Sequence, residues 1–209
     1  MKIIVVDDHA VVRRGLIQIL KSMQEVNFIG EASSGNELIE LLKEDEYDVV
    51  VLDISMPGKS GLDVLKEIKT IKQKVSVLIL SIHPEEQYAV RALKAGASGY
   101  ITKDSAPEEL VTAVQRIMEG RKYISQSLAE KLAGSYDISS SKLPHEILSD
   151  REFEVFKMIA SGNTVSNIAE SLFLSAKTIS TYQSRIYEKT GLKSRSEITL
   201  YAIKNGLIE

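Results

Sequence analysis

Five residues in the front part of the chain have side chains suited to metal or phosphoryl chemistry, and each lies at the end of a short apolar run. They are, in chain order, Asp7, Asp8, Asp53, Ser81 and Lys103. Crowded carboxylates are costly unless a cation lies among them, and one or two carboxylates with water and phosphate suit Mg²⁺. A carboxylate beside a divalent ion can also attack phosphorus and form an aspartyl phosphate. The residue types indicate this chemistry, provided that the fold brings them together.

Each of these side chains also has an ordinary structural explanation. Taken singly, Asp8 is as well explained as the cap of a helix, Ser81 as a strand-end hydroxyl and Lys103 as a surface lysine. Acting together, Lys103 would neutralise phosphoryl oxygens and Ser81 would donate a hydrogen bond to one of them. The three histidines do not have the spacing of zinc ligands, so zinc is not indicated. The set as a whole favours the functional interpretation.

Alternating strand and helix signals position these residues. Strands are expected over 2–6, 28–32, 49–53, 75–80 and 99–102, and helices over 10–20, 34–42, 62–68, 85–95 and 107–118. This alternation predicts an α/β fold with a doubly wound, five-stranded parallel sheet of order 2-1-3-4-5, similar to flavodoxin. Ligands bind at the carboxyl ends of the strands in such sheets. The predicted order brings the ends of strands 1, 3, 4 and 5 into one crevice, where the five side chains should converge.

Local signals mark several helix starts and core-facing sides. Three serine–glutamate pairs match the capping box: Ser34 with Glu37, Ser149 with Glu152, and Ser194 with Glu197. The first helix should turn an apolar stripe inward, made of Val11, Val12, Leu16, Ile19 and Leu20.

The composition is typical of a soluble globular protein. The 209 residues are 44% hydrophobic and 26% charged, and they include no cysteine, which excludes a disulfide framework and a thiolate metal site. The apolar stretch near Met1 is too short for a signal peptide, and no apolar run approaches membrane-spanning length. A cytoplasmic location with no membrane partner is therefore expected.

Charge and composition change after residue 120. Residues 1–120 carry 14 basic and 19 acidic side chains, whereas residues 121–209 carry 12 and 10. A linker is expected over 121–145, with a short helix over 127–133 and a flexible, serine-rich stretch over 134–144. A small all-α domain should follow from residue 146 to the end, with helices over 149–161, 165–172, 175–190 and 194–205.

The helix expected over 175–190 has two unlike faces. Its core side carries Ile179, Tyr182 and Ile186. The opposite side is short-chained, polar and basic, and consists of Lys177, Ser180, Thr181, Ser184 and Arg185. Two helices joined by a tight turn, the second with such a face, are typical of a helix-turn-helix that presents basic groups to phosphates and hydroxyls to bases. A solvated helix face is the alternative for this helix taken alone.

Residues 1–120 resemble the receiver domain of two-component response regulators. The resemblance rests on Asp7-Asp8, Asp53 with Met56-Pro57-Gly58 and Gly61, Ser81, Ala95-Gly96-Ala97, Gly99-Tyr100 and Lys103. It implies that Asp53 accepts a phosphoryl group from a sensor histidine kinase. It also implies that Mg²⁺ is held by Asp8, Asp53 and the main-chain carbonyl of Ser55, and that Asp7 assists through water. Ser81 and Tyr100 resemble the paired switch residues, and Asp104, where proline is common, is similar to a subfamily with Lys-Asp at this point.

Residues 146–209 resemble the LuxR-type DNA-binding domain of the NarL/FixJ family. The motifs are Leu148 to Val155, Ile159 to Gly162, Ile168-Ala169, Leu174 to Ile179 and Tyr201-Ala202-Ile203. The implied DNA contacts are Lys177, Thr178, Ser180, Thr181, Ser184 and Arg185, and the implied dimer contact is Leu200, Tyr201 and Lys204. Family members often carry lysine in place of Ser180, so this chain should prefer a different target sequence and bind with a weaker electrostatic component.

The two resemblances together imply a DNA-binding transcription regulator controlled by phosphorylation. Phosphorylated Asp53 is expected either to free the DNA-binding domain from the receiver or to promote a homodimer, so that paired promoter half-sites in double-stranded DNA are bound. No enzymatic activity is expected beyond phosphorylation and dephosphorylation of the protein itself.

Two alternatives from other classes stay open. A hydrolase or phosphotransferase of the haloacid-dehalogenase kind would carry an acidic aspartate where this chain has Ser55. A constitutive DNA-binding protein would not need the complete acidic site. Binding to RNA is disfavoured because no sheet surface with stacking aromatic residues is evident.

Overall fold

The computed structural model describes residues 1–126, 128–130 and 143–208, and the chain divides into two compact units. One unit is Met1–Tyr136 and the other is Asp137–Glu209. The short helix expected over 127–133 and the serine-rich stretch expected over 134–144 lie mostly outside the described residues. Within the described part of the chain, no helix is long and apolar enough to cross a membrane.

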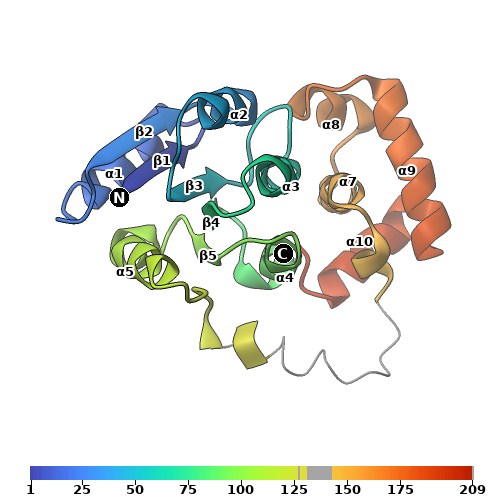
Figure 1. Cartoon of the computed structure of the whole chain (residues 1–209). Coiled ribbons are helices and arrows are strands. Elements are labelled where there is room, and N and C mark those ends of the chain that lie inside the picture. The colour runs from blue at the N-terminus through green and yellow to red at the C-terminus, as the bar shows by residue number, and fades with distance from the viewer. Residues whose placement is uncertain (127, 131–142, 209) are drawn as a thin grey trace. The chain divides into compact units, whose positions relative to one another are not determined.

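The first unit is built on a five-stranded parallel sheet of order β2-β1-β3-β4-β5, which confirms the predicted topology (Figure 1). The strands are β1 (Lys2–Val6), β2 (Phe28–Ala32), β3 (Val49–Asp53), β4 (Ser76–Ser81) and β5 (Gly99–Thr102). Every residue of β3 is buried. A parallel strand covered on both faces needs a continuous apolar run, and the sequence of β3 supplies one up to its final carboxylate.

Helices cover both faces of this sheet. They are α1 (Ala10–Leu20), α2 (Gly35–Glu44), α3 (Gly61–Ile71), α4 (Glu85–Lys94) and α5 (Ala106–Met118). α1 packs against α5 on one face, whereas α2, α3 and α4 follow one another on the other face (Figure 1). This arrangement buries the apolar sides of the strands and leaves their carboxyl ends accessible at one edge.

The strand register aligns the functional ends of the sheet. Asp53 pairs with Leu80, so Ser81 follows one residue later at the same edge. Ser81 in turn pairs with Thr102, and the backbone N–H of Lys103 donates to the carbonyl of Ser81 at 2.7 Å. The convergence predicted from the strand order is therefore present.

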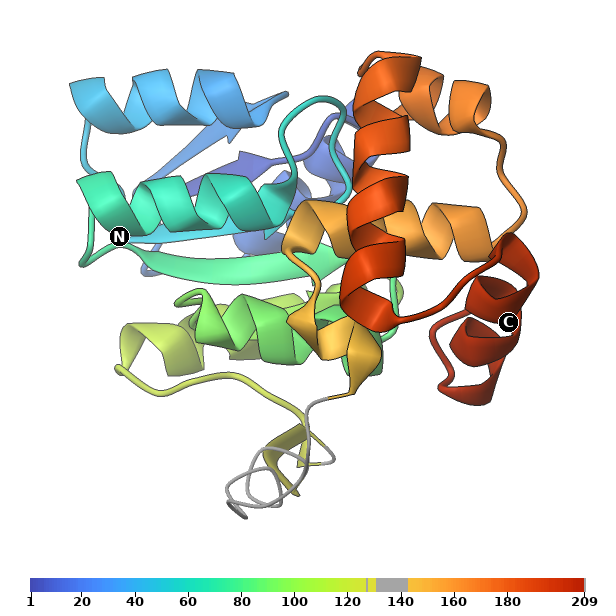
Figure 2. The same cartoon turned by 90° about the vertical axis from the view of Figure 1, so that its right-hand side faces the viewer.

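The second unit is a bundle of short helices (Figures 1 and 2). Its described elements are the 3₁₀ turn η1 (Pro144–Ile147) and the helices α7 (Asp150–Ala160), α8 (Val165–Ser171), α9 (Ala176–Thr190) and α10 (Arg195–Lys204). α9 packs on α7 and α8, and α10 packs on α7. The fully buried side chains include Phe153, Phe156, Ile168, Ile179, Ile186 and Ile198. The predicted all-α unit with a helix-turn-helix is thereby confirmed.

Two of the three predicted capping boxes are only half formed. The box at Ser149 is complete. At Ser34 and Ser194 the hydroxyl accepts from the backbone of the glutamate, but the carboxylate accepts from the N–H of the preceding residue, Ser33 or Lys193. The backbone explains this shift, because φ is −156° at Ser34 and −146° at Ser194 but −62° at Ser149. The extended cap brings the earlier N–H to the carboxylate.

The apolar stripe predicted for α1 is wrong at its first residue. Leu16 and Leu20 are buried, whereas the side chain of Val11 is 85% exposed. Val12, in the same first turn, packs against the core. Successive helical residues are rotated by about 100°, so Val11 lies outside the arc that Val12, Leu16, Ile19 and Leu20 share, and the periodicity itself excludes it.

Residues just after α5 add to the edge of the sheet. Tyr123 forms an isolated parallel bridge with Gly99 of β5. The N–H of Tyr123 donates to Ser98 at 3.0 Å, and the N–H of Tyr100 donates to the carbonyl of Tyr123 at 3.2 Å. A Cβ at Gly99 would lie 2.8 Å from that carbonyl oxygen, so the close approach depends on glycine. The beginning of the predicted linker is therefore held against β5.

Replacing Gly61 with alanine should destabilise the first unit by about 1–3 kcal/mol, because the new Cβ would overpack the backbone. That Cβ would lie 2.5 Å from both the carbonyl oxygen of Asp53 and the Cα of Ile54. Gly15 is a matched control, since its Cβ would meet nothing within 4 Å, and Gly15→Ala should raise stability by about 0.5–1 kcal/mol. Urea denaturation measures both effects, and equal midpoints for the two variants would contradict the expected clash.

Candidate functional site

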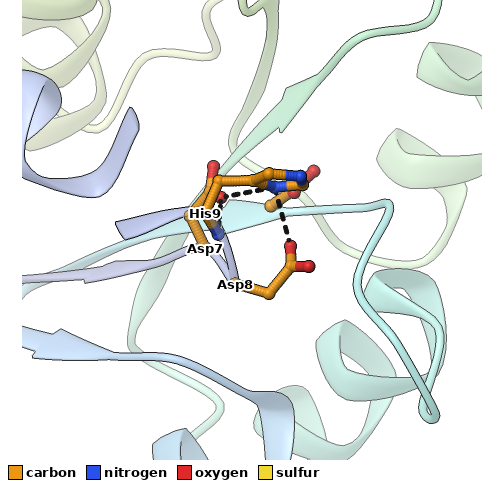
Figure 3. A group of neighbouring side chains, drawn as sticks. Asp7, Asp8 and His9 are labelled. Atoms are coloured by element: carbon orange, nitrogen blue, oxygen red, sulfur yellow. Dashed lines mark hydrogen bonds and ion pairs between the residues drawn. The ribbon is translucent and has the colours of Figure 1, made fainter. Parts of the chain in front are cut away.

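An acidic cluster lies at the carboxyl edge of the sheet. Asp7 and Asp8 follow β1, and Asp53 ends β3. One ligand atom from each of these aspartates and from His9 lies within 4.8 Å of the others. Figure 3 shows Asp7, Asp8 and His9 of this group. The side chains of Asp7 and Asp53 are 0% exposed. The three carboxylates that the sequence predicts to converge do so, and two of them are removed from water.

Lys103 compensates the two buried charges. Its ammonium nitrogen lies 2.7 Å from Oδ2 of Asp7 and 2.8 Å from Oδ2 of Asp53. The lysine side chain is itself only 12% exposed. Because Lys103 directly follows β5, these two ion pairs connect the ends of β1, β3 and β5. The lysine is therefore a component of the site rather than a surface residue.

Burial and charge pairing act in opposite directions on this group. Burial raises the pKa of the Asp53 carboxyl above its ordinary value, although the hydrogen bonds from Lys103 and the Ser55 backbone oppose that rise. Burial lowers the pKa of Lys103, but its hydrogen bonds to Asp53 and Asp7 outweigh this effect and raise the pKa overall. The ammonium group thus stays charged, and the carboxylates depend on positive charge nearby.

The donor set fits a divalent cation. Oδ1 of Asp8 is buried, and within the described residues its partner is Nδ1 of His9 at 3.0 Å. Oδ1 of Asp53 accepts one from the N–H of Ser55 at 3.0 Å, which leaves further lone pairs on that carboxylate. Carboxylate oxygens grouped in this way suit Mg²⁺. Lys103 alone offers one positive charge to three carboxylates, and a cation would supply more.

Ser81 and Tyr100, the predicted switch pair, are linked through one intervening residue. Ser81 is fully buried, and its hydroxyl oxygen accepts from the N–H of His83 at 2.9 Å. The hydroxyl of Tyr100 donates to the carbonyl oxygen of His83, also at 2.9 Å. A displacement of Ser81 would therefore act on the same main-chain segment that holds the tyrosine ring.

His9 and Arg13 are part of this site although the sequence argument did not include them. Nδ1 of His9 lies 3.0 Å from Oδ1 of Asp8. Arg13 donates to the carbonyl oxygen of Asp7 at 2.7 Å and to Glu31 at 2.8 Å. The position of His9 directly after the aspartate pair was the available signal. The contact of Arg13 depends on how α1 leaves the sheet, which local sequence does not reveal.

The outer face of α9 is as predicted from its periodicity. The buried side carries Ile179 and Ile186. The exposed residues on the other side are Lys177, Ser180, Thr181, Ser184 and Arg185. Thr178 differs from these five because it is half-buried and its hydroxyl lies 2.8 Å from that of Ser175, the N-cap of α9.

The hydroxyls on this face are already bonded within the helix. Ser180, Thr181 and Ser184 each donate to the carbonyl oxygen four residues earlier, at 3.0–3.1 Å. Each hydroxyl keeps free acceptor lone pairs while its proton is engaged. In this conformation they are suited to accept from donors such as the amino groups of bases, whereas Lys177 and Arg185 remain available for phosphates.

The three residues proposed for a dimer contact do not share one environment. Leu200 is 69% exposed and Lys204 is exposed. Tyr201 is half-buried, and its hydroxyl lies 2.8 Å from Nδ1 of His145 in η1. Ile203, which the sequence argument named only within a motif, is 52% exposed and lies one turn of α10 from Leu200. The exposed apolar side of α10 therefore consists of Leu200 and Ile203.

An ion pair between a buried carboxylate and an exposed lysine connects α9 to α7. The carboxylate of Glu152, which is 2% exposed, accepts from Lys189 at 2.6 Å and from the N–H of Ser149 at 2.8 Å. Burial raises the pKa of Glu152, but these hydrogen bonds outweigh it and leave the pKa below its ordinary value. The capping box of α7 is thereby connected to the last turn of α9.

Family models match both units of the chain. Residues 3–115 match the model of the response regulator receiver domain, and residues 146–202 match that of bacterial regulatory proteins of the luxR family. The chain is 38% identical to the oxygen regulatory protein NreC of Staphylococcus epidermidis, with all of both chains covered. The chain belongs to the NarL/FixJ family of response regulators. The response regulator GacA of Pseudomonas aeruginosa is 34% identical, with 100% of this chain and 98% of GacA covered.

This response regulator is also similar to solved structures of RcsB. One is RcsB of Salmonella enterica serovar Typhimurium bound to promoter rprA in the presence of the phosphomimetic BeF3⁻. It has a TM-score of 0.67 and 28% identity, and the match covers 96% of this chain and 98% of RcsB. Another, of two RcsB dimers bound to two parallel DNAs, has a TM-score of 0.60 at 28% identity, with 96% of each chain covered.

Glu152→Gln should lower the free energy of unfolding of the helical unit by about 1–2 kcal/mol at pH 7, because a charged hydrogen-bond acceptor is lost. The native state lowers the pKa of Glu152 below the ordinary 4.5. Its contribution is therefore fully present above that pH and disappears as the pH falls through the folded-state value. Urea denaturation at pH 7 and in the acid range measures this, with exposed Glu188→Gln as control. A loss of the same size at both pH values would contradict a charge-based contribution.

Proposed function

We propose that Asp53 accepts a phosphoryl group from a histidine kinase and that this modification controls promoter binding by the second unit. The observation that carries the proposal is the fully buried Asp53 carboxylate with the Lys103 ammonium 2.8 Å away. A buried acid kept at the carboxyl edge of a parallel sheet, beside a cation and two further carboxylates, is arranged for phosphoryl chemistry rather than for stability.

The proposed transfer is Mg-dependent, and its bonds change only between Asp53 and the phosphohistidine donor. A carboxylate oxygen of Asp53 attacks phosphorus, the bond from phosphorus to the imidazole nitrogen of the phosphohistidine breaks, and the ring leaves as neutral imidazole with its proton on the other nitrogen. Lys103 is placed to pair with the phosphoryl oxygens, and Ser81 to donate a hydrogen bond to one of them. Hydrolysis of the resulting acyl phosphate by water restores Asp53.

The cation site is assigned to the same cluster. Asp8, Asp53 and the main-chain carbonyl of Ser55 would hold Mg²⁺, with Asp7 assisting through water. When bound, the ion supplies positive charge that stabilises the charge on the phosphoryl oxygens. Asp7 has a second task in this scheme, because its Oδ1 accepts from the N–H of His9 at 2.8 Å and so holds the turn between β1 and α1.

The signal leaves the site through Ser81 and Tyr100. Movement of the Ser81 hydroxyl toward the phosphoryl group would break its hydrogen bond with the N–H of His83. The main chain of His83 would then be released, and with it the carbonyl oxygen that accepts from the Tyr100 hydroxyl. Tyr100 also donates its backbone N–H to Tyr123, at the start of the segment that leads to the second unit. Phosphorylation would bias a two-state receiver in this way.

The output is binding of α9 to double-stranded DNA, with Lys177 and Arg185 on phosphates and Ser180, Thr181 and Ser184 near bases. Two copies would pair through the exposed side of α10 and occupy paired half-sites. The RcsB structures with promoter DNA and with dimers support this scheme. A regulator of promoters acts in the cytoplasm, and we assign it no substrate other than its own Asp53.

Asp53→Asn should abolish the effect of a phosphodonor. With Mg²⁺ and acetyl phosphate, the wild type should gain one phosphoryl group by intact mass spectrometry, form dimers and bind promoter DNA about 5–150-fold more tightly, the range of a typical coupling free energy. Exposed Asp104→Asn is the control and should respond like the wild type. Stimulation that persists unchanged in Asp53→Asn would refute Asp53 as the acceptor.

Lys177→Ala should weaken DNA binding similarly for all sequences. One lost phosphate contact is expected to reduce the slope of log affinity against log salt concentration by about 1. Lys43→Ala in α2 of the receiver removes the same charge and should leave the slope unchanged. Fluorescence anisotropy of labelled promoter DNA over a salt series measures both variants. Equal slopes for Lys177→Ala and the wild type would remove Lys177 from the interface.

A further inference from the structure

His9 contributes a nitrogen atom to the acidic cluster. Its Nδ1 lies 3.0 Å from Oδ1 of Asp8 and 3.3 Å from Oδ1 of Asp7. Figure 3 shows the imidazole pointing toward both carboxylates. The histidine is the N-cap residue of α1, yet its side chain makes no capping hydrogen bond. Its ring is therefore directed at the site and not at the helix.

The position of the ring is held by the backbone. The N–H of His9 donates to Oδ1 of Asp7 at 2.8 Å, and Asp7 is fixed in turn by its ion pair with Lys103 at 2.7 Å. These contacts fix the backbone of His9. The position of Nδ1 relative to the cluster then depends only on the side-chain torsion angles of His9. The side chain is 63% exposed, so the rest of the ring faces outward and leaves a path for an incoming ion.

The separations match those of ligands that share a metal ion. Adjacent ligands of an octahedral ion with bonds of about 2.0–2.2 Å lie about 3 Å apart. Nδ1 of His9 has this separation from Oδ1 of Asp8, which is buried and has no other hydrogen-bond or ion-pair partner within the described residues. The carboxylate oxygen and the imidazole nitrogen beside it thus offer two adjacent positions of one coordination sphere.

We propose that His9 is a nitrogen ligand for a divalent transition-metal ion held by Asp8 and Asp53. The inference rests on the proposed cation site and extends it. Magnesium prefers oxygen and binds there through carboxylates, carbonyl and water. Nickel, cobalt and zinc accept imidazole readily, and manganese accepts both ligand types. The site therefore distinguishes between cations: Mg²⁺ binds without His9, whereas a transition metal recruits the imidazole and binds more tightly.

The competing explanation is a hydrogen bond or ion pair between His9 and the aspartates, with no part in metal binding. Removal of such a bond would change the affinities for Mg²⁺ and for a transition metal by the same factor, or change neither. Removal of a ligand that only the transition metal uses would change one and not the other. Comparison of two ions on one variant therefore separates the explanations.

Isothermal titration calorimetry of the full chain with Ni²⁺ and with Mg²⁺, without phosphodonor, is the test. His9→Gln should weaken Ni²⁺ binding by about tenfold or more, since even the loss of residues that orient metal ligands costs this much. Its affinity for Mg²⁺ should change by less than twofold. Unchanged Ni²⁺ affinity, or equal losses for both ions, would overturn the proposal. Circular dichroism checks that the variant is folded.

Electron spin echo spectroscopy of bound Mn²⁺ provides a direct readout. A coordinated imidazole should produce ¹⁴N modulation in the wild type and none in His9→Gln. The chain contains three histidines, so His83→Gln and His145→Gln complete the control set, and both should keep the modulation. Modulation that survives in His9→Gln, or that disappears in His83→Gln, would overturn the assignment to His9.

Asp8→Asn separates this proposal from the proposed function on which it rests. Loss of both Mg²⁺ and Ni²⁺ binding in this variant supports the shared site. If Asp8→Asn binds Mg²⁺ like the wild type, the cation site of the receiver is misassigned and both proposals fail. If Asp8→Asn loses Mg²⁺ but His9→Gln keeps wild-type Ni²⁺ affinity, only the role of His9 fails.

Discussion

The first unit depends on how two fully buried carboxylates are neutralised. Asp7 and Asp53 are 0% exposed, and an isolated buried charge is costly enough to oppose folding. Lys103 meets both at 2.7 and 2.8 Å. This pairing is satisfied only if β1 and β3 are neighbours and the end of β5 lies within reach of both. The need to pair these buried charges therefore constrains both the strand order and the geometry of the site.

The same constraint leaves excess negative charge at the site. Asp7 and Asp53 share one lysine and Asp8 lies beside them, so Lys103 does not balance the three carboxylates. The main chain of His83 accepts from Tyr100 and donates to Ser81, and the backbone of Tyr100 supports Tyr123 beyond α5. These hydrogen bonds connect the sheet edge with the start of the connecting segment, and each of them has a main-chain group as donor, acceptor or both.

In the helical unit, the polar helix α9 is held on a small hydrophobic core. Only Ile179 and Ile186 of α9 are buried, and the polar and basic residues of its opposite side are exposed. Small cores contribute little stability, and the ion pair between Glu152 and Lys189 adds a fixed point at the far end of the helix. The hydroxyls of the outer face donate to backbone carbonyl oxygens of α9 itself, so these side chains lie close to the helix and do not project from it.

Much of this architecture follows from the sequence alone. The apolar runs that become β1 and β3 end on aspartates, and alternation of strands with helices leads to the observed strand order and to convergence at one edge. Helical periodicity likewise assigns the two faces of α9. These features are local or follow from general rules of chain connection. Tertiary structure alone decided the pairing of Tyr123 with Gly99 and the approach of His9 to Asp8. Each of these depends on where an element ends relative to a neighbour that is distant in sequence, or on how a side chain turns at a strand end, and no local pattern encodes that.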